Sequence, residues 1–230
     1  HYDVRLEQKD WSTADFDDSK WNGVGYRGAP SQNVVSQQVQ PIRIVETIPA
    51  NTWKKINDST YIFDFARNMS GVTRIKVSGE EGTVVKLKHG ERLYDNGRVN
   101  TSNIDVYHRP VDDSDPFQTD ILILSGKGED EFMARFNYKG FRYVEVTSSK
   151  PIELQQNSLT AYFVHSDVPQ KGEISTSNPL VNRLWWATNN AYLSNLMGYP
   201  TDCPQREKNG WTGDGHFAIC LLYTSPSPRD

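Results

Sequence analysis

Apolar and polar residues alternate with a period of two along much of the chain up to residue 165. The alternation is clearest in residues 71–77 and 83–89, where it places one face of a strand on a core and the other in water. Turn-forming residues follow these segments at 78–82 and 95–97. Short strands separated by turns predict a mainly β fold, with an antiparallel β-sandwich over residues 46–168. The other expected strands of this sandwich are residues 61–65, 117–124, 131–138, 141–147 and 158–164.

Residues 1–45 carry a shorter form of the same pattern. A strand is expected over residues 2–6 and extended chain over residues 41–45, with a polar turn region between them. We interpret this part as the C-terminal end of a preceding β-sandwich domain. Trp11 and Trp21 lie in the polar region, where burial in a sandwich core is the favoured interpretation and a platform for sugar rings is the alternative.

The pattern changes to a helical period near residue 169. Asn178 followed by Pro179 provides an N-cap and a proline at the first helical position, and Gly198 can end the helix. A polar loop then precedes a second helix, expected around residues 215–219. Two helices that have only just begun cannot bury their apolar faces, so we interpret residues 169–219 as the start of a helical domain. The apolar stripe of the first helix comprises Leu180, Leu184, Ala187, Ala191 and Leu196.

Both ends of the chain have unusual sequences. His1 is followed at once by a strand-like pattern, so we expect the chain to begin inside a domain. Residues 220–230 change abruptly to a Ser/Pro-rich string whose reverse translation resembles a transposon-end adapter used for sequencing libraries. We therefore expect an artefactual tail after Ile219 and an internal fragment of a longer protein. A disordered Pro/Ser tail is the alternative.

Composition and charge exclude several classes of protein. The chain has 25 Lys+Arg and 29 Asp+Glu, and no segment has the basic excess of a nucleic-acid-binding surface. No apolar run reaches the roughly 18–20 residues of a membrane span. Cys203 and Cys220 are too few for a disulfide scaffold. The acidic clusters lack EF-hand spacing and the histidines lack i, i+4 pairing, so we expect no metal site.

Residues 199–214 concentrate the groups that can carry chemistry. Three carboxylates, an arginine, a lysine, a tryptophan and two glycines fall within sixteen residues. Two carboxylates on either side of a third can raise its pKa and keep it protonated near neutral pH. Tryptophan offers an apolar platform for the C–H face of a sugar, and arginine orients hydroxyls or carboxylates. A solvated charged loop is the alternative, but this mixture favours a site.

The string DCPQREKNGWTGD, residues 202–214, is similar to the signature of bacterial α-L-rhamnosidases, the family 78 glycoside hydrolases. The resemblance extends to FDFARNMSGVTRIKVSGEEG, FNYKGFRYVEV and HSDVPQKGEISTSNPLVNRLW, and it covers about residues 2–219. It implies the end of one β-sandwich at 1–45, a complete concanavalin-like β-sandwich at 46–168 and the start of an (α/α)6 barrel at 169–219.

The motif also implies individual roles. Glu207 matches the general acid, and Asp202 and Asp214 match residues that hold rhamnose hydroxyls. Trp211 matches an aromatic residue of the sugar subsite, and Arg206 lies beside the acid. Inverting hydrolysis needs a second carboxylate as general base. In the family this base lies far downstream, beyond the end of this chain.

The resemblance therefore implies a fragment, inactive alone, of an enzyme that removes terminal non-reducing α-L-rhamnose from glycosides or polysaccharides without a cofactor. Cys203 is interpreted as a structural thiol rather than a nucleophile. The alternative from another class is a non-catalytic glycan-binding β-sandwich protein.

Overall fold

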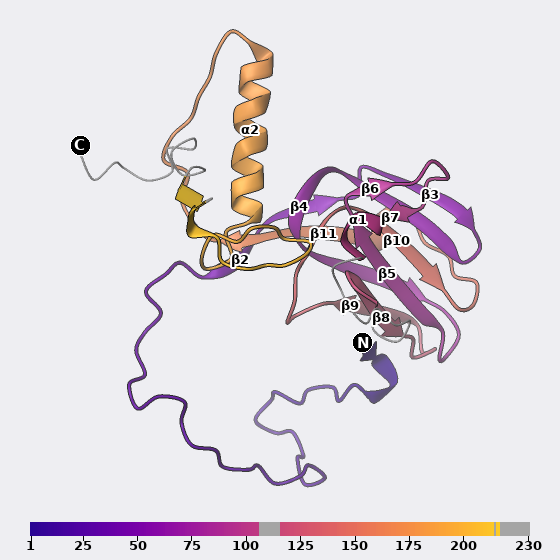
Figure 1. The fold of residues 1–230 in the computed structure, drawn as a ribbon. Coiled ribbons are helices and arrows are strands. Elements are labelled where there is room, and N and C mark those ends of the chain that lie inside the picture. Colours follow the sequence, from indigo (N-terminus) through magenta and orange to yellow (C-terminus); the bar gives the residue numbers. More distant parts are fainter. Residues whose placement is uncertain (106–115, 214, 217–230) are drawn as a thin grey trace.

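The structure of the chain, a computed structural model, describes residues 1–105, 116–213 and 215–216. A nine-stranded sheet has the order β1-β8-β5-β10-β4-β11-β2, with β3 and β9 also paired to β4. Figure 1 shows this sheet curling on itself, with α2 projecting from it and the N-terminal segment leading away. The predicted fold class, mainly β with antiparallel layers followed by a helical start, is confirmed.

Most elements are short strands. The described strands are β1 Tyr2–Asp3, β2 Ile42–Pro49, β3 Thr52–Asn57, β4 Thr60–Ser78, β5 Val84–Gly90, β6 Arg92–Leu93, β7 Val99–Asn100, β8 Thr119–Ile123, β9 Glu129–Met133, β10 Lys139–Ser148 and β11 Leu159–Ser166. The described helices are the 3-10 turns η1 Val4–Leu6 and η2 Gln156–Ser158, the short α1 Ser102–Asp105 and the long α2 Pro179–Ser194.

Strand β4 joins the two halves of the curled sheet. Its first half pairs with β3 and β10, and its second half pairs with β9 and β11. Between the halves Ala66 has a φ of 62°, and its N–H donates to Oδ1 of Asp64 at 2.7 Å. The pairing with β10 shifts register opposite this point, between Phe141 and Tyr143. The expectation of two separate strands, 61–65 and 71–77, was wrong. The chain bends at Ala66, but β4 continues without a break from Thr60 to Ser78.

The core lies inside the curl of the sheet. The alternation in β5 is confirmed, because Val85 and Leu87 are fully buried while Val84 and Lys86 are only partly buried. A polar anchor is also present, since the buried hydroxyl of Tyr61 donates to the carbonyl of Ile152 at 2.7 Å. Burying each large apolar side chain contributes about 1.5–3 kcal/mol. The largest fully buried apolar residues are Tyr61, Phe63, Met69, Ile75, Leu87, Leu122, Leu124, Phe141, Leu154 and Leu159.

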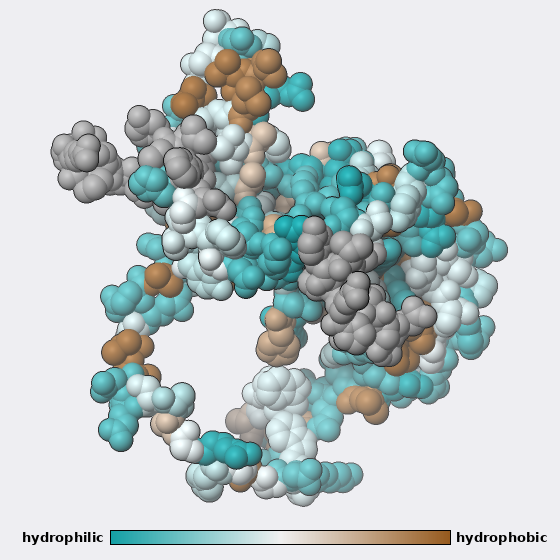
Figure 2. All heavy atoms as spheres, in the orientation of Figure 1, coloured by the Kyte–Doolittle hydropathy of each residue, from teal (hydrophilic) through white to brown (hydrophobic). Residues whose placement is uncertain are grey.

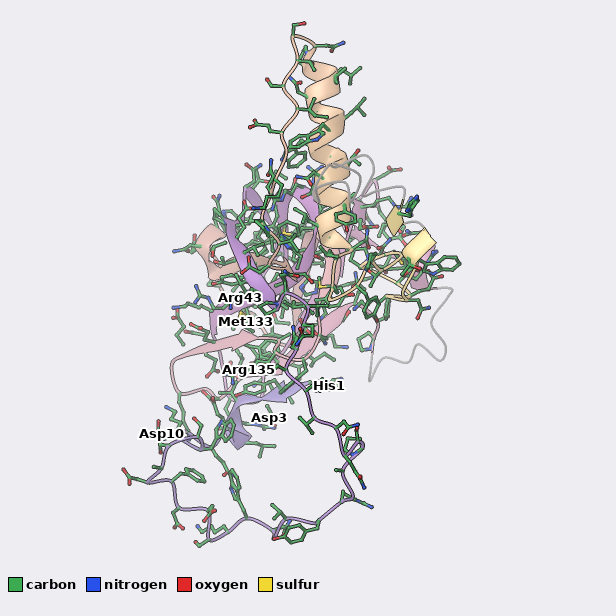
Figure 3. The ribbon with its side chains drawn as sticks, turned by 90° about the vertical axis from the view of Figure 1, so that its left-hand side faces the viewer. His1, Asp3, Asp10, Arg43, Met133 and Arg135 are labelled. Carbon is green, nitrogen blue, oxygen red and sulfur yellow. The ribbon has the colours of Figure 1, made fainter. Side chains whose placement is uncertain are left out.

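The N-terminal segment meets the sheet at both of its ends. β1 pairs in parallel with β8, and β2 pairs with β11 and runs through the expected boundary at residues 45–46. In Figure 3, His1 and Asp3 lie by the sheet near Arg135, whereas Asp10 lies on the part that leads away. Trp11 and Trp21 are 56% and 48% exposed, so the prediction that they are buried was wrong for this chain.

Strand β1 is shorter than expected because Asp3 ends it. The carboxylate of Asp3 accepts the backbone N–H of Arg5 at 3.0 Å and caps the 3-10 turn η1. The strand predicted over residues 2–6 therefore covers only Tyr2–Asp3.

Helix α2 begins as the sequence predicts. Pro179 is its first residue, and Oδ1 of Asn178 accepts the N–H of Leu180 at 2.9 Å. The helix ends at Ser194, before Gly198, which has a φ of 82° in the following turn. Leu180 and Leu184 are about 60% exposed, and Figure 2 shows apolar residues gathered on the projecting part of α2.

Most of what the sequence predicts for the C-terminal end of the chain cannot be compared with the structure. Most of the second helix, expected at 215–219, and the whole segment 220–230 lie outside the described residues. Within the described ranges, no helix combines the length and the apolar character needed to cross a membrane.

Candidate active site

Residues 199–211, here called the motif loop, close on themselves after α2. An isolated bridge pairs Thr201 with Gly210. On either side of it, the N–H of Asp202 donates to Asn209 O and the N–H of Trp211 donates to Pro200 O, both at 3.0 Å. The side chain of Asp202 strengthens this closure, because its Oδ1 accepts the N–H of Asn209 at 2.9 Å. The two ends of the loop are thus held together, and residues 203–208 form its tip.

Three of the predicted site residues meet at this tip around Cys203. The Sγ atom of Cys203 lies 3.4 Å from Oδ2 of Asp202 and 3.6 Å from Oε2 of Glu207. The N–H of Glu207 donates to the same sulfur at 3.4 Å. Nη2 of Arg206 lies 3.2 Å from Oε2 of Glu207. The loop therefore brings two carboxyl groups, a thiol and a guanidinium into one cluster.

The cluster shifts the pKa values of Asp202 and Cys203 in opposite directions. Burial alone would raise the pKa of Asp202, but hydrogen bonds from the side chain of Glu207 and from neighbouring backbone N–H groups hold it below its ordinary value. Burial raises the pKa of Cys203, and the nearby Asp202 raises it further. Asp202 is therefore ionised at neutral pH, and Cys203 keeps its proton.

The ligand-type atoms of Asp202, Cys203 and Glu207 lie within 4.8 Å of one another, a spacing that a metal ion could bridge. A thiol binds metals as the thiolate, which the raised pKa of Cys203 disfavours. The cation of Arg206 also lies on the carboxylate of Glu207, where a metal would compete with it. The donor set fits two carboxyl groups held by a thiol and a guanidinium better than a metal centre.

A fourth predicted residue, Trp211, lies at the neck of the motif loop, where its backbone N–H donates to Pro200 O and the residue is 54% exposed. Asp214 lies outside the described residues.

Two residues that the sequence analysis did not single out hold the loop on the sheet. Nζ of Lys208 donates to the carbonyl oxygen of Tyr138 at 2.6 Å and lies 4.4 Å from the centre of the Tyr138 ring. These residues are 70 positions apart in the chain. No local pattern connects them, so sequence reasoning had no signal for this contact.

A separate cavity of about 250 Å³ lies where α2 meets the sheet and is lined by residues including Arg67, His165 and Trp186. Nη2 of Arg67 lies 2.6 Å from Oε2 of Glu46, and its guanidinium lies over the rings of Phe163 and Trp186 at 4.9 and 6.0 Å. This cavity contains none of the motif-loop residues. Its lining belongs to the packing of the helix against the sheet.

Comparison with known proteins identifies three consecutive matches along the chain. Residues 1–46 match the α-L-rhamnosidase N-terminal domain, and residues 54–165 match the bacterial α-L-rhamnosidase concanavalin-like domain. Residues 169–225 match the bacterial α-L-rhamnosidase 6-hairpin glycosidase domain. The motif loop lies within this third match.

Individual relatives agree with these matches. An α-L-rhamnosidase of Streptomyces avermitilis is 35% identical over 99% of this chain and 22% of its own length. The solved α-L-rhamnosidase from Dictyoglumus thermophilum has a TM-score of 0.84 and 34% identity over 96% of this chain and 25% of its own. The Streptomyces avermitilis structure complexed with L-rhamnose has a TM-score of 0.78 and 36% identity over 93% of this chain and 20% of its own. The chain thus spans about a fifth to a quarter of the length of these relatives. On these matches and this fold, the chain belongs to the bacterial α-L-rhamnosidase family.

Proposed function

We propose that this chain is part of an inverting α-L-rhamnosidase, a glycoside hydrolase that removes terminal non-reducing α-L-rhamnose from glycosides or polysaccharides. The observation that carries the proposal is the pair of carboxyl groups of Asp202 and Glu207, which the motif loop brings within 4.8 Å of each other beside Cys203. The matched relatives support it, since they are named α-L-rhamnosidases and one was solved with L-rhamnose.

In this proposal Glu207 is the general acid. One of its carboxyl oxygens lies within 4.8 Å of a carboxyl oxygen of Asp202. The pKa of Asp202 is held below its ordinary value, so Asp202 is an ionised carboxyl group beside the proposed acid. The side chain of Glu207 is 39% exposed, so it can reach a bound glycoside. In the proposed step its carboxyl group gives a proton to the glycosidic oxygen as the bond to the rhamnosyl carbon breaks.

The other motif residues act on the sugar. Asp202 and Asp214 hold rhamnose hydroxyls, and Arg206 orients Glu207 through the contact of its Nη2 with Oε2 at 3.2 Å. Trp211 lines the sugar subsite with its exposed ring. An inverting hydrolase also needs a second carboxylate as general base, about 6.5–9.5 Å from the acid with a water between them. In this proposal the base belongs to a part of the protein outside residues 1–230. Residues 1–230 alone are therefore inactive in this proposal.

The proposal also assigns the parts of the chain. Residues 1–45 end one β-sandwich domain, residues 46–168 form a complete one, and residues 169–219 begin the (α/α)6 barrel. The confirmed helix start at Asn178 and Pro179 supports the last assignment.

The test compares two leaving groups in the full-length protein that contains this chain. p-Nitrophenolate leaves without a proton, whereas the alkoxide of methyl α-L-rhamnoside needs one. Glu207→Gln should lower kcat on the methyl glycoside by about 10²–10⁴-fold and lower it much less on the p-nitrophenyl glycoside. Rhamnose binding, measured by calorimetry, should change little. The matched control is Glu129→Gln, an exposed carboxylate on β9, which should behave as the wild type.

Two results would contradict the proposal. Absence of turnover on every rhamnoside, with rhamnose still bound, would favour a glycan-binding protein instead. Equal losses of binding and turnover in Glu207→Gln would remove the acid role from this residue.

A further inference from the structure

Lys208, which directly follows Glu207, lies against the sheet instead of extending into solvent. Its ammonium group donates to the Tyr138 carbonyl at 2.6 Å and lies over the Tyr138 ring. Its φ of 57° is in the left-handed region, which a lysine adopts only where its surroundings impose it. Burial and the neighbouring charge of Lys139 lower the pKa of Lys208 to about 8, which agrees with a desolvated anchor.

The other end of the carboxyl segment is held by the same residue. Thr201, which directly precedes Asp202, is 6% exposed, and its side chain interacts with the hydroxyl of Tyr138, whose pKa it lowers against the effect of burial. Asn195, at the end of α2, also holds Thr201, because the N–H and the hydroxyl of Thr201 both donate to its carbonyl, at 2.7 and 3.0 Å. Tyr138 thus contacts the residue before Asp202 and the residue after Glu207.

A third contact fixes the loop just beyond Tyr138. A Cβ atom on Gly140 would lie 2.7 and 2.8 Å from Cβ and N of Gln205, and 2.9 Å from Pro204, so the loop packs directly on bare backbone. Gly140 itself is held by the amide of Gln118, which donates to its carbonyl at 2.7 Å and accepts its N–H at 3.3 Å. The motif loop therefore packs on the start of β10, and hydrogen bonds from Gln118 hold that part of the backbone in place.

We propose that Lys208 and Tyr138 are positioning residues that fix the orientation of the Glu207 carboxyl group, so that the β-sheet part of the chain takes part in the acid step. The inference rests on the proposed role of Glu207 as general acid. Neither residue acts on the sugar; each acts through the backbone on either side of the carboxyl pair. Catalytic groups on loops depend on such support, since a displacement of about 1 Å can cost about 100-fold in rate.

The test is made in the full-length protein with the same two leaving groups. Lys208→Met removes the bond to the Tyr138 carbonyl and keeps most of the side-chain volume. It should lower kcat on methyl α-L-rhamnoside by about tenfold or more, lower kcat on the p-nitrophenyl glycoside by less than about threefold, and leave KM unchanged. Lys208→Arg restores a cationic donor and should recover most of the loss. Lys54→Met, on an exposed position of β3, is the matched control and should have no effect.

Tyr138→Phe provides a second, milder test. It deletes the hydroxyl that holds Thr201 but keeps the ring and the carbonyl that hold Lys208. It should give a smaller loss with the same dependence on the leaving group, and it replaces the Lys208→Met test if that variant fails to fold.

The outcomes separate this inference from the proposed function. Unchanged kcat values in both variants overturn the inference, and so do equal losses on both substrates, because a merely structural role does not distinguish leaving groups. If the loss of kcat depends on the leaving group in Glu207→Gln but not in the two positioning variants, only the inference fails. If Glu207→Gln itself shows no such dependence, the proposed function fails.

Discussion

The buried imidazole of His89 should make the stability of the sheet depend on acid pH. His89 lies in β5 and is fully buried. Its Nε2 lies 2.9 Å from the hydroxyl of Thr73 and its Nδ1 lies 3.2 Å from the carbonyl of Gln118. The ring also meets Phe141 edge-on, with 4.9 Å between centroids. Burial lowers the pKa of His89 to about 4, while Asp120 and Lys139 act in opposite directions on it.

The size and sign of the effect follow from this pKa. The ordinary pKa of histidine is 6.5, so the folded and unfolded values differ by about 2.5, at about 1.36 kcal/mol for each pKa unit. Between pH 6.5 and 4 the unfolded chain binds a proton that the folded chain does not. The contribution of neutral His89 is therefore complete above pH 6.5, and about 3 kcal/mol of stability is lost as the pH falls to 4.

The assay is urea unfolding followed by tryptophan fluorescence at pH 7 and pH 4. Carboxyl groups also titrate between pH 7 and pH 4, but they do so equally in the wild type and in a variant that lacks only His89. The difference between the two proteins in stability lost therefore reports on His89. His89→Gln keeps a polar side chain that does not titrate. The wild type should lose about 3 kcal/mol more than His89→Gln between the two pH values, and His1→Gln, at an exposed histidine, should follow the wild type. Equal pH dependence in the wild type and in His89→Gln would refute the reasoning.

Two further predictions concern the frame of the fold. Gly71→Ala would place a Cβ atom 2.0 Å from the carbonyl oxygen of Tyr162, where β4 runs between β10 and β11, so we expect it to cost about 3 kcal/mol or more in urea unfolding. An unchanged midpoint would mean that the strands separate easily there. Asn178→Ala removes the oxygen that caps α2 and should cost about 1 kcal/mol, measured in thermal unfolding followed by circular dichroism, whereas Asn178→Asp should cost little. Equal effects of the two Asn178 substitutions would contradict the capping role.

Features fixed by neighbouring residues could be predicted from the sequence. The start of α2 depends only on Asn178 and Pro179, and the structure places the cap where the pattern does. The burial of Val85 and Leu87 follows from the alternation in β5, because one face of that strand meets the core. In the motif loop, the resemblance of residues 202–214 to the family signature singled out Asp202, Arg206 and Glu207, and the structure brings these three together.

Features that depend on distant partners could not be predicted. Residues 66–70 looked like a break between strands, yet β10 pairs with β4 on both sides of the bend, at residues 60–64 and 69–71, so the strand continues through it. Strand β3 was missed altogether, because its residues 52–57 are mostly exposed and polar and become a strand only by pairing with β4. Trp11 and Trp21 were expected to be buried as aromatics of a sandwich core, but between η1 and β2 the segment that carries them contains no strand to cover them.

The same division between local and distant determinants applies to the candidate site. The identity of its groups lies within residues 202–211, but their placement depends on the start of β10, about 70 positions earlier in the chain. Gly140 shows why the two parts cannot vary independently, since even a methyl group there would meet the backbone nitrogen of Gln205 at 2.8 Å. A motif loop with the correct residues on a different sheet would lose both contacts made by Tyr138. The β-sheet part of the chain is therefore as much a determinant of the geometry of Glu207 as the motif itself.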